Sequence, residues 1–185
     1  MRMVITGARG QVGGALQASL NGMGTVIALD RAQLDLANAD AIRTALRELR
    51  PTLVINAAAY TAVDAAESDQ ASAFRINADA PRVLAEEAER LGAPLIHYST
   101  DYVFDGNKQG TWLEDDVPAP LSVYGRSKLA GEQAIAEVGG AHLILRCSWV
   151  YGLTGKNFLL TMLKLAESRD TLSIVDDQIV TPTWS

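Results

Sequence analysis

Cysteine and histidine are scarce in this sequence. Cys147 is the only cysteine among 185 residues, and His97 and His142 are the only histidines. One cysteine forms no disulfide framework and no cysteine-based zinc site, and two isolated histidines make no metal site. We therefore expect a protein of the reducing cytoplasm, in which both histidines lie in strands with satisfied ring nitrogens.

Long apolar runs and basic clusters are missing as well. No stretch of about 18 apolar residues occurs, so no membrane span is expected. The first seven residues lack the apolar core of a signal peptide. The formal net charge is −6 and the sequence pI is about 4.9. This balance argues against nucleic acid or an anionic membrane as the main partner. An anionic substrate stays compatible with it, because local backbone amides and one or two arginines can outweigh the global charge.

The composition that is present is typical of one globular domain, with 48% hydrophobic and 21% charged residues. Apolar runs that read as strands alternate with segments of helical periodicity. Strands are expected at 2–6, 25–29, 53–59, 94–100, 142–146 and 172–175. Helices are expected near 12–23, 42–49, 64–91, 124–138 and 158–166. This alternation predicts an α/β fold with a doubly wound parallel sheet of the Rossmann type.

A glycine-rich turn follows the first expected strand. Gly7, Gly10 and Gly13 let a backbone turn tightly and approach a pyrophosphate at a helix N-terminus. The spacing is GxxGxxG and not the standard GxGxxG, so a turn without a ligand is the alternative. Asp30 and Arg31 end the second strand, where an acidic residue binds adenosine ribose hydroxyls. Arg31 and Arg9 could instead accept a 2′-phosphate, which leaves NAD and NADP both open.

Tyr124 and Lys128 lie four residues apart at the start of an expected helix, so both side chains share one face. An ammonium beside a phenol favours the phenolate, and we expect Lys128 to lower the pKa of Tyr124. Such a phenol can protonate a carbonyl oxygen while the carbon is reduced. Ser99 and Thr100 end the fourth strand, and in a parallel sheet that places them at the carboxyl edge, where the site lies.

These stretches together resemble the extended short-chain dehydrogenase/reductases, and within them the dTDP-4-dehydrorhamnose reductase family. The similarity extends over almost the whole chain, and Ser-Thr-Asp-Tyr-Val-Phe at 99–104 is its most specific part. The matching stretches are 4–13, 56–64, 99–104, 124–128, 148–152 and 175–183. Members of the family continue into a substrate domain. The resemblance therefore implies that residues 1–176 form the NAD(P)-binding domain with the catalytic residues. Residues 177–185 would then begin a substrate-binding domain that is largely absent from this chain.

The resemblance also implies roles for individual residues. Thr100 would hydrogen-bond the substrate carbonyl, Tyr124 would donate the proton, and Lys128 would tune the tyrosine and hold the nicotinamide ribose. The substrate would be contacted by Thr100, Asp101, Tyr102 and Trp149. The cofactor, NADPH or NADH, would be bound by Gly7, Gly10, Gln11, Val12, Gly13, Asp30, Arg31, Asp35, Leu36, Ala59, Tyr60, Thr61, Tyr98, Tyr124 and Lys128.

One position departs from the family. Relatives that bind magnesium at a dimer contact carry Val-Gly-x-Glu-Leu, whereas this chain has Ala15 in place of the glutamate. Alanine cannot ligate a hard cation. No metal is therefore expected, and a homodimer, if formed, is not expected to have the magnesium link.

The function implied by the resemblance is reduction of the C4 keto group of dTDP-4-dehydro-6-deoxy-L-mannose to dTDP-L-rhamnose, with hydride from NAD(P)H. Another extended family member acting on nucleotide sugars is one alternative, such as an epimerase or a reductase of a different keto sugar. A dehydratase is disfavoured, because Asp101 follows Thr100 without an accompanying glutamate. A non-catalytic NADP-binding protein, similar to the regulatory subunit of methionine adenosyltransferase, is the alternative from another class.

Overall fold

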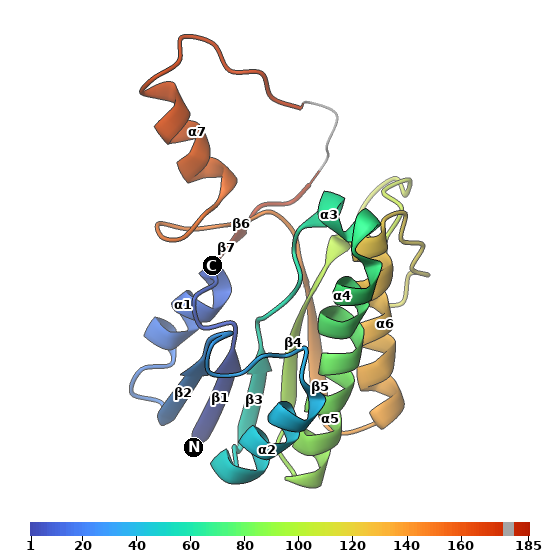
Figure 1. The fold of residues 1–185 in the computed structure, drawn as a ribbon. Coiled ribbons are helices and arrows are strands. Elements are labelled where there is room, and N and C mark those ends of the chain that lie inside the picture. The colour runs from blue at the N-terminus through green and yellow to red at the C-terminus, as the bar shows by residue number, and fades with distance from the viewer. Residues whose placement is uncertain (176–179) are drawn as a thin grey trace.

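The computed structural model describes residues 1–175 and 180–185. Its main sheet has five parallel strands in the order β2-β1-β3-β4-β5, which confirms the predicted doubly wound α/β architecture (Figure 1). The strands are β1 (Arg2–Thr6), β2 (Thr25–Leu29), β3 (Leu53–Asn56), β4 (Leu95–Thr100) and β5 (His142–Cys147).

Helices connect consecutive strands, and their sides of the sheet follow from the strand order. The chain winds from β1 outward to β2, and then back across β1 to β3, β4 and β5. Right-handed crossovers therefore put α1 (Gln11–Ser19) on one face and α2 (Ala39–Leu49), α5 (Ala80–Arg90) and α6 (Val123–Val138) on the other. The largest buried cluster lies on this second face, where Val4 and Val54 of the sheet meet Leu46 of α2 and Leu84 of α5.

The connection between β3 and β4 is less regular than one long helix. The sequence predicts a mostly helical stretch from 64 to 91, whereas the structure divides it into α3 (Val63–Ser68), α4 (Gln70–Phe74), a π-helical turn η1 (Arg75–Asp79) and α5. Asp69 causes the first break, because it leaves the helical region (φ −123°, ψ 56°) and its side chain caps α4 at the Ser72 N–H.

Helix α6 lies unusually close to its neighbours at two glycines. A Cβ added to Gly131 would lie 2.1 Å from the carbonyl oxygen of Asn77 in η1. One added to Gly125 would lie 2.3 Å from the carbonyl oxygen of Tyr102, in the 3₁₀ turn η2 (Asp101–Val103). Only glycine lets the α6 backbone approach η1 and η2 this closely, and this contact fixes the helix that carries Tyr124.

Two of the expected strands differ from the structure. The strand predicted at 53–59 ends at Asn56, because the next residues turn beneath the loop at Gly7. The strand predicted at 172–175 is wrong: these residues form no strand, and Ile174 and Val175 are 52% and 65% exposed. A strand needs a neighbouring strand for its backbone hydrogen bonds, and residues 172–175 pair with none in the described part of the chain.

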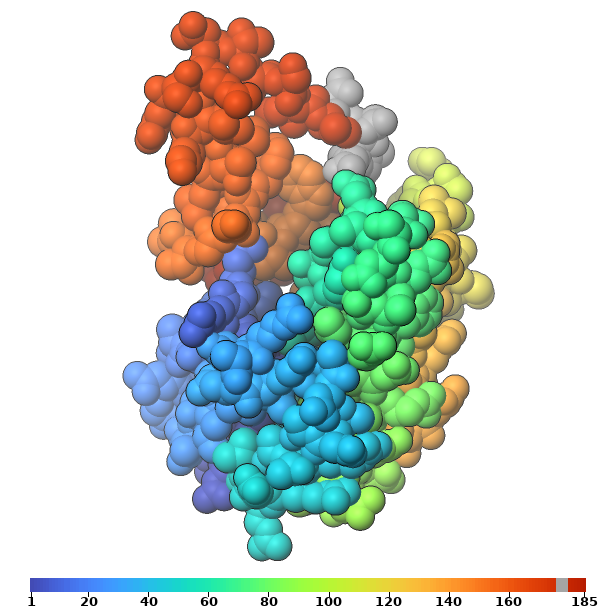
Figure 2. Space-filling view, in the orientation of Figure 1, coloured from blue at the N-terminus to red at the C-terminus, as the bar shows by residue number. Residues whose placement is uncertain are grey.

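The C-terminal part of the chain forms a separate small unit above the carboxyl edge of the sheet (Figure 1). Strands β6 (Val150–Tyr151) and β7 (Thr183–Trp184) pair in parallel, and α7 (Phe158–Ala166) projects beyond them. In the space-filling view this orange and red segment stands as a lobe over the blue N-terminal elements (Figure 2). The predicted boundary between residues 176 and 177 falls outside the described residues. Of the helices described, none is long and apolar enough to cross a membrane.

Candidate active site

The strand order defines where a ligand site is expected. Winding reverses between β1 and β3, and ligands of open parallel sheets bind outside the carboxyl ends of the strands at such a reversal. The turn after β1 holds the glycine loop, and the turn after β3 holds the small residues Ala57, Ala58 and Ala59. Thr100 ends β4 at the same edge. The sequence-predicted cofactor and catalytic residues are therefore brought to one side of the molecule.

The glycine loop packs directly on the residues after β3. Gly7 has a φ of +76°, and a Cβ there would lie 2.8 Å from the Ala58 nitrogen. A Cβ on Gly13 would lie 2.2 Å from the Gly7 carbonyl oxygen. Gly10 precedes α1 without a side-chain cap, so the first N–H groups of this nine-residue helix have no side-chain acceptor at the cap. Such a helix start is suited to an anionic group.

Gln11 opens α1, but its side chain is engaged elsewhere. Its amide nitrogen donates to the Val150 carbonyl oxygen (3.2 Å), and its amide oxygen accepts from Asn157 Nδ2 (3.0 Å). Asn157 also donates to the Gly152 carbonyl oxygen (2.9 Å). The contact of Gln11 with a phosphate would therefore come from its backbone, while its side chain fastens the segment after β6 to the glycine loop.

Asp30 lies beside the glycine loop at the end of β2. One carboxylate oxygen accepts from the backbone N–H groups of Ala32 and Gln33 (2.9 and 3.1 Å), and the other pairs with Arg9 Nε (2.7 Å). The Arg9 side chain is 85% exposed, so its guanidinium stays accessible to an anion. Arg31 is exposed at the same turn. Arg9 and Arg31 therefore lie near the Asp30 carboxylate, a group that can accept hydrogen bonds from ribose hydroxyls.

Asp35 and Leu36 follow this turn and differ in exposure. The Asp35 carboxylate accepts from the Ala37 N–H (3.0 Å), which shapes the loop. Leu36 is buried in the main core cluster, only 8% exposed. Leu36 therefore anchors in the core a loop that was predicted to bind the cofactor.

Buried Asn77 fixes the predicted cofactor groove at Tyr60. Its amide oxygen accepts from the Tyr60 N–H (2.8 Å), and its amide nitrogen donates to the Tyr60 carbonyl (3.0 Å) and to Ser127 Oγ (3.0 Å). Ser127 is on α6, directly before Lys128. Asn77 thereby ties the segment at Tyr60 to helix α6.

Two caps fix the start of α6. The Ser122 hydroxyl accepts from the Gly125 N–H (3.0 Å), and the Glu67 carboxylate of α3 accepts from the Val123 N–H (2.8 Å). A carboxylate at a helix N-terminus also interacts favourably with the helix dipole. Both caps hold the first turn, and Tyr124 is the second residue of the helix.

Tyr124 lies at the carboxyl edge of β4 with its phenol mostly buried, 9% exposed. The ring of Tyr102 meets it edge-on, with centroids 5.7 Å apart. Thr100 Oγ1 accepts from the Tyr102 N–H (3.2 Å) and donates to the Asp101 carboxylate (3.2 Å). The predicted residues Thr100, Asp101, Tyr102 and Tyr124 therefore form one cluster.

The expected lowering of the Tyr124 pKa is wrong for the free protein. Burial raises the pKa of Tyr124 above its usual value, and the charge of Asp101 adds to the increase, while the Thr100 hydroxyl opposes it. The Lys128 ammonium is not among the groups that shift it. Across the described residues, Lys128 makes hydrogen-bonding contacts with Tyr98 and His97 and none with Tyr124.

Lys128 is one of the largest fully buried side chains, 1% exposed. Its amine donates to the Tyr98 carbonyl oxygen (2.6 Å) and lies 3.2 Å from Nε2 of His97. Burial lowers the pKa of Lys128 to about 8, although the charge of Glu132 one turn along α6 opposes this. Glu132 is itself paired with Arg146 of β5 and accepts a hydrogen bond from Ser99.

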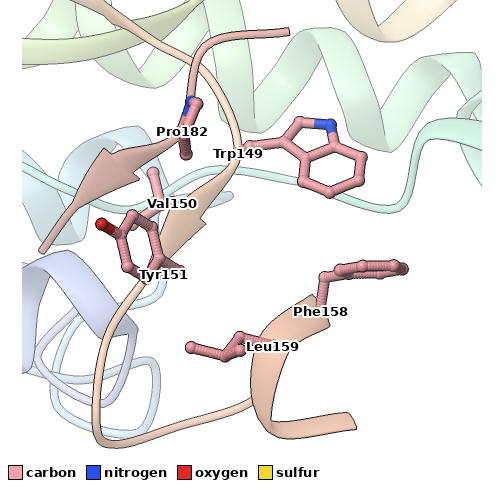
Figure 3. A pocket seen from close by; sticks show the side chains of 6 residues that line it. All are labelled: Trp149, Val150, Tyr151, Phe158, Leu159 and Pro182. Atoms are coloured by element: carbon pink, nitrogen blue, oxygen red, sulfur yellow. The ribbon is translucent and has the colours of Figure 1, made fainter. Parts of the chain in front are cut away.

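Trp149 lies beyond the end of β5, at the rim of the site. Its backbone has a positive φ of 42°, an uncommon conformation for a bulky residue, and its ring packs on Phe158 (4.8 Å between centroids). It lines an apolar pocket of about 430 Å³ (Figure 3). The other lining residues are Val150, Tyr151, Phe158, Leu159 and Pro182. Trp149 therefore packs with residues of β6 and α7 around this apolar pocket.

Several polar residues that shape the site were not assigned to it from the sequence, although His97 was correctly expected in a strand with satisfied ring nitrogens. They are Asn56, Glu67, Asn77, His97 and Glu132, and each makes contacts with residues more than ten positions away. A polar residue inside an apolar strand, as at Asn56 and His97, was the one signal present. It does not reveal the partner. Among the described residues, no cluster of three or more His, Cys, Asp or Glu side chains could hold a metal ion.

A model of the protein family described as "RmlD substrate binding domain" matches residues 1–185. The chain belongs to this family. The family predicted from the sequence is thereby confirmed, since a dTDP-4-dehydrorhamnose reductase of Burkholderia thailandensis is 49% identical over 185 residues. Those residues cover 100% of this chain and 62% of the relative.

Two further similar proteins are a relative named for a different keto sugar and a reductase whose crystal structure contains NADP. A Streptomyces antibioticus protein, named as a probable dTDP-4,6-dihydroxy-2-methyloxan-3-one 4-ketoreductase, is 44% identical over 100% of this chain and 63% of its own. The crystal structure of a Bacillus anthracis dTDP-4-dehydrorhamnose reductase in complex with NADP matches with a TM-score of 0.95 and 42% identity. It covers 99% of this chain and 66% of that one. The chain thus spans less than two thirds of the length of these relatives.

Proposed function

We propose that this protein reduces the C4 keto group of a dTDP-4-dehydro-6-deoxy sugar, dTDP-4-dehydrorhamnose, to give dTDP-L-rhamnose. The observation that carries the proposal is the placement of Thr100, Tyr124 and Lys128. Strand β4 and helix α6 bring the three side chains to the carboxyl edge of the sheet, next to the switch point at the glycine loop. The likeness to named reductases of the family supports it.

The residues at the switch point fit a nicotinamide dinucleotide. The loop that contains Gly7, Gly10 and Gly13 is packed so closely that a Cβ at any of the three positions would crowd backbone atoms. The start of α1 offers backbone N–H groups to a pyrophosphate. Asp30 would hold the adenosine ribose, with Arg9 beside it for a 2′-phosphate. NADPH is favoured over NADH, since the Bacillus anthracis relative was crystallised with NADP. When bound, the reduced nicotinamide would supply the hydride for the carbonyl carbon.

The chain's own residues would then handle the oxygen of that carbonyl. The Thr100 hydroxyl would orient it by a hydrogen bond. Tyr124, buried and protonated, would donate its phenolic proton to the oxygen as negative charge develops there. Lys128 would hold the nicotinamide ribose through its amine. The burial of Tyr124 would strengthen these interactions.

A nucleotide sugar would approach from the side of β6 and α7. Trp149 offers an apolar face and one N–H, and Asp101 and Tyr102 lie beside Thr100 and Tyr124. We assign the cofactor and the catalytic residues to 1–176. Substrate selection by the segment from 177 onward remains a prediction, as does a homodimer without magnesium at Ala15.

A reductase of a different dTDP-linked 4-keto sugar is the second candidate. The Streptomyces antibioticus relative supports it, because it is 44% identical and named for another keto sugar. The same catalytic residues would serve both reactions. Comparison of kcat/KM for the two keto sugars on the full-length protein decides between them.

Replacing Tyr124 by phenylalanine tests the proposed chemistry. Loss of the proton donor should lower kcat by roughly 10²- to 10⁴-fold. NADPH binding, followed by its fluorescence, should change little, because the phenol ring remains. The assay is NADPH oxidation with the dTDP-4-keto sugar. Full turnover by Y124F would sink the mechanism, whereas cofactor binding without turnover in the wild type would favour a regulatory binding protein.

A further inference from the structure

Gln11 belongs to two parts of the molecule at once. Its backbone opens α1, at the helix start that is proposed above to receive the pyrophosphate. Its side-chain nitrogen Nε2 donates to the carbonyl oxygen of Val150, the first residue of β6 (3.2 Å). The small unit of β6, β7 and α7 is therefore joined to the glycine loop by the side chain of Gln11.

Asn157 completes this contact from the start of α7. It is buried, and its amide nitrogen donates to Gln11 Oε1 (3.0 Å) and to the Gly152 carbonyl oxygen (2.9 Å). Its amide oxygen accepts from the Leu160 N–H (2.9 Å), as the N-cap of α7. The nitrogen and the oxygen of this side chain are therefore both engaged.

Backbone groups at the two ends fix the orientation of both amides. The Leu160 N–H can only donate, so it must face the Asn157 oxygen, and the Asn157 nitrogen then points to Gln11. The Val150 carbonyl can only accept, so it must face the Gln11 nitrogen. Turning either amide would oppose like groups and leave polar atoms unpaired. The two side chains, which we call the amide link, therefore have one arrangement.

The loop between β6 and α7 packs on the same side chain. Gly155 has a φ of +79°, and a Cβ added to it would lie 3.0 Å from Gln11 Cγ. A Cβ added to Gly152 would lie 2.4 Å from the side-chain oxygen of Ser185, which follows β7. The two glycines let the loop close on Gln11 and on the end of β7, so a displacement of Gln11 passes to the loop by direct contact.

Trp149 directly precedes the carbonyl that Gln11 holds. Its φ of 42° is uncommon for a bulky residue, and such a conformation persists where neighbouring contacts hold it. The Trp149 carbonyl oxygen accepts from the Thr183 N–H of β7 (3.2 Å), and the next carbonyl, that of Val150, accepts from Gln11. The backbone that carries the indole is therefore held by β7 and by the start of α1 together.

We propose that Gln11 and Asn157 are positioning residues that couple the cofactor loop to the nucleotide-sugar side of the site. This inference rests on the proposed function, in which the start of α1 holds the pyrophosphate and Trp149 contacts the nucleotide sugar. A cofactor at the start of α1 fixes the Gln11 backbone, and the amide link carries that position to β6 and α7. Each ligand therefore strengthens the binding of the other, since coupling between two sites is reciprocal.

Binding of dTDP to the full-length protein measures this coupling without turnover. This probe lacks the sugar that would meet the nicotinamide, so direct contact between the reacting ends of the ligands is avoided. The negative charges of dTDP and NADPH would only weaken their joint binding. Calorimetric titration with and without saturating NADPH gives two Kd values for dTDP. We expect NADPH to lower the wild-type Kd at least about fivefold.

Asn157→Asp breaks the amide link and keeps the helix cap. The new carboxylate accepts from the Leu160 N–H but cannot donate to Gln11 or Gly152. Gln11 can turn its nitrogen to that carboxylate only by giving up Val150. We expect the effect of NADPH on dTDP binding to fall below about twofold. Gln11→Met removes both contacts from the other side, and the double variant should lose no more coupling than either single one.

Asn38→Asp is the matched control. It makes the same substitution at the N-cap of α2, where the side chain accepts from the Ala41 N–H of its own helix. This variant should keep the wild-type coupling. A wild type without coupling overturns the proposal, as does coupling retained in both N157D and Q11M, or lost in N38D as well. If N157D does not fold, Q11M against N38D decides.

The same protein separates this inference from the reductase function. Coupled binding of dTDP and NADPH without turnover of the dTDP-4-keto sugar would refute the reductase function and leave the amide link standing. Turnover of the keto sugar without coupling would refute the role of the amide link alone.

Discussion

At the scale of single residues, two opposite effects act on the phenol of Tyr124. A neighbouring cation would lower its pKa, and burial under Tyr102 raises it. Burial prevails in the free protein because the Lys128 amine points to Tyr98 and His97. The resting phenol therefore keeps the proton that it would donate.

The glycine loop gives a prediction at the same scale. Gly13→Ala places a Cβ 2.2 Å from the Gly7 carbonyl oxygen, so the loop must shift away from its cradle. We expect the Kd for NADPH to rise at least tenfold, about 1.4 kcal/mol, when binding is measured by NADPH fluorescence.

Gly14→Ala is the matched control. The next residue in α1 has no atom within 4 Å of an added Cβ. Alanine there should stabilise the helix by about 0.5 to 1 kcal/mol in urea unfolding and leave NADPH affinity unchanged. Equal weakening of binding by both substitutions would contradict the packing account.

At the scale of secondary-structure elements, the first turn of α6 carries the capping contacts that restrain Tyr124. Ser122 and Glu67 cap its first turn from two different segments. Both contacts restrain the helix where Tyr124 leaves it. These two caps therefore contribute to the position of the phenol, together with the close packing of α6 at Gly125 and Gly131.

Removing the N-cap of α6 should affect activity more than stability. Ser122→Ala is expected to cost about 1 kcal/mol in unfolding free energy, because the Gly125 N–H loses its acceptor. Asn38→Ala removes the equivalent cap of α2, where Asn38 accepts from the Ala41 N–H (3.0 Å). The two variants should lose similar stability in urea titrations, and only S122A should lower kcat, by several-fold. A similar loss of kcat in N38A would show that general destabilisation is the cause.

Elements with a local signal could be predicted from the sequence, and those set by distant partners could not. The five sheet strands and α6 follow from apolar runs, helical periodicity and glycines. The break at Asp69 comes from a local cap on the Ser72 N–H inside a stretch of helical composition, and the early end of β3 depends on packing against the glycine loop. Residues 172–175 have the composition of a strand, but none of the strands described in residues 1–175 and 180–185 pairs with them.

At the scale of the whole molecule, the ion pair between Arg47 of α2 and Glu87 of α5 links two helices over the main core. Glu87 is 1% exposed and receives two hydrogen bonds from Arg47 (2.6 and 2.8 Å). The hydrogen bonds from Arg47 hold the pKa of Glu87 below its usual value, against the effect of burial. The pair therefore joins elements that are 40 residues apart in sequence.

This pair predicts how stability depends on pH. Because the folded-state pKa is lowered, the stabilisation is present above the usual glutamate pKa and is lost as pH falls through the folded value. The urea midpoint of the wild type should fall between about pH 5 and about pH 3 more steeply than that of Glu87→Gln. Glu89→Gln, exposed on the same helix, should keep the wild-type slope. Equal slopes in all three proteins would exclude Glu87 as a source of the acid sensitivity.

The candidate site shows the same division between local and distant information. Gly7, Thr100, Tyr124 and Lys128 could be found because their spacing and neighbours form motifs. Asn56 and His97 could not be assigned, since their role arises only when three strands and α6 meet. The Lys128 amine contacts Tyr98 and His97, so the spacing of four residues did not by itself predict which groups the lysine meets.

The close approach of α6 to η1 and η2 has a consequence for engineering. A thermostabilisation campaign guided by helix propensity would choose Gly125 and Gly131 as targets for alanine. Their clearances of 2.3 and 2.1 Å to backbone oxygens make both substitutions damaging, and neither oxygen can move without η1 or η2. Saturation libraries of α6 should therefore return wild-type glycine at both positions, whereas Gly14 should accept many side chains.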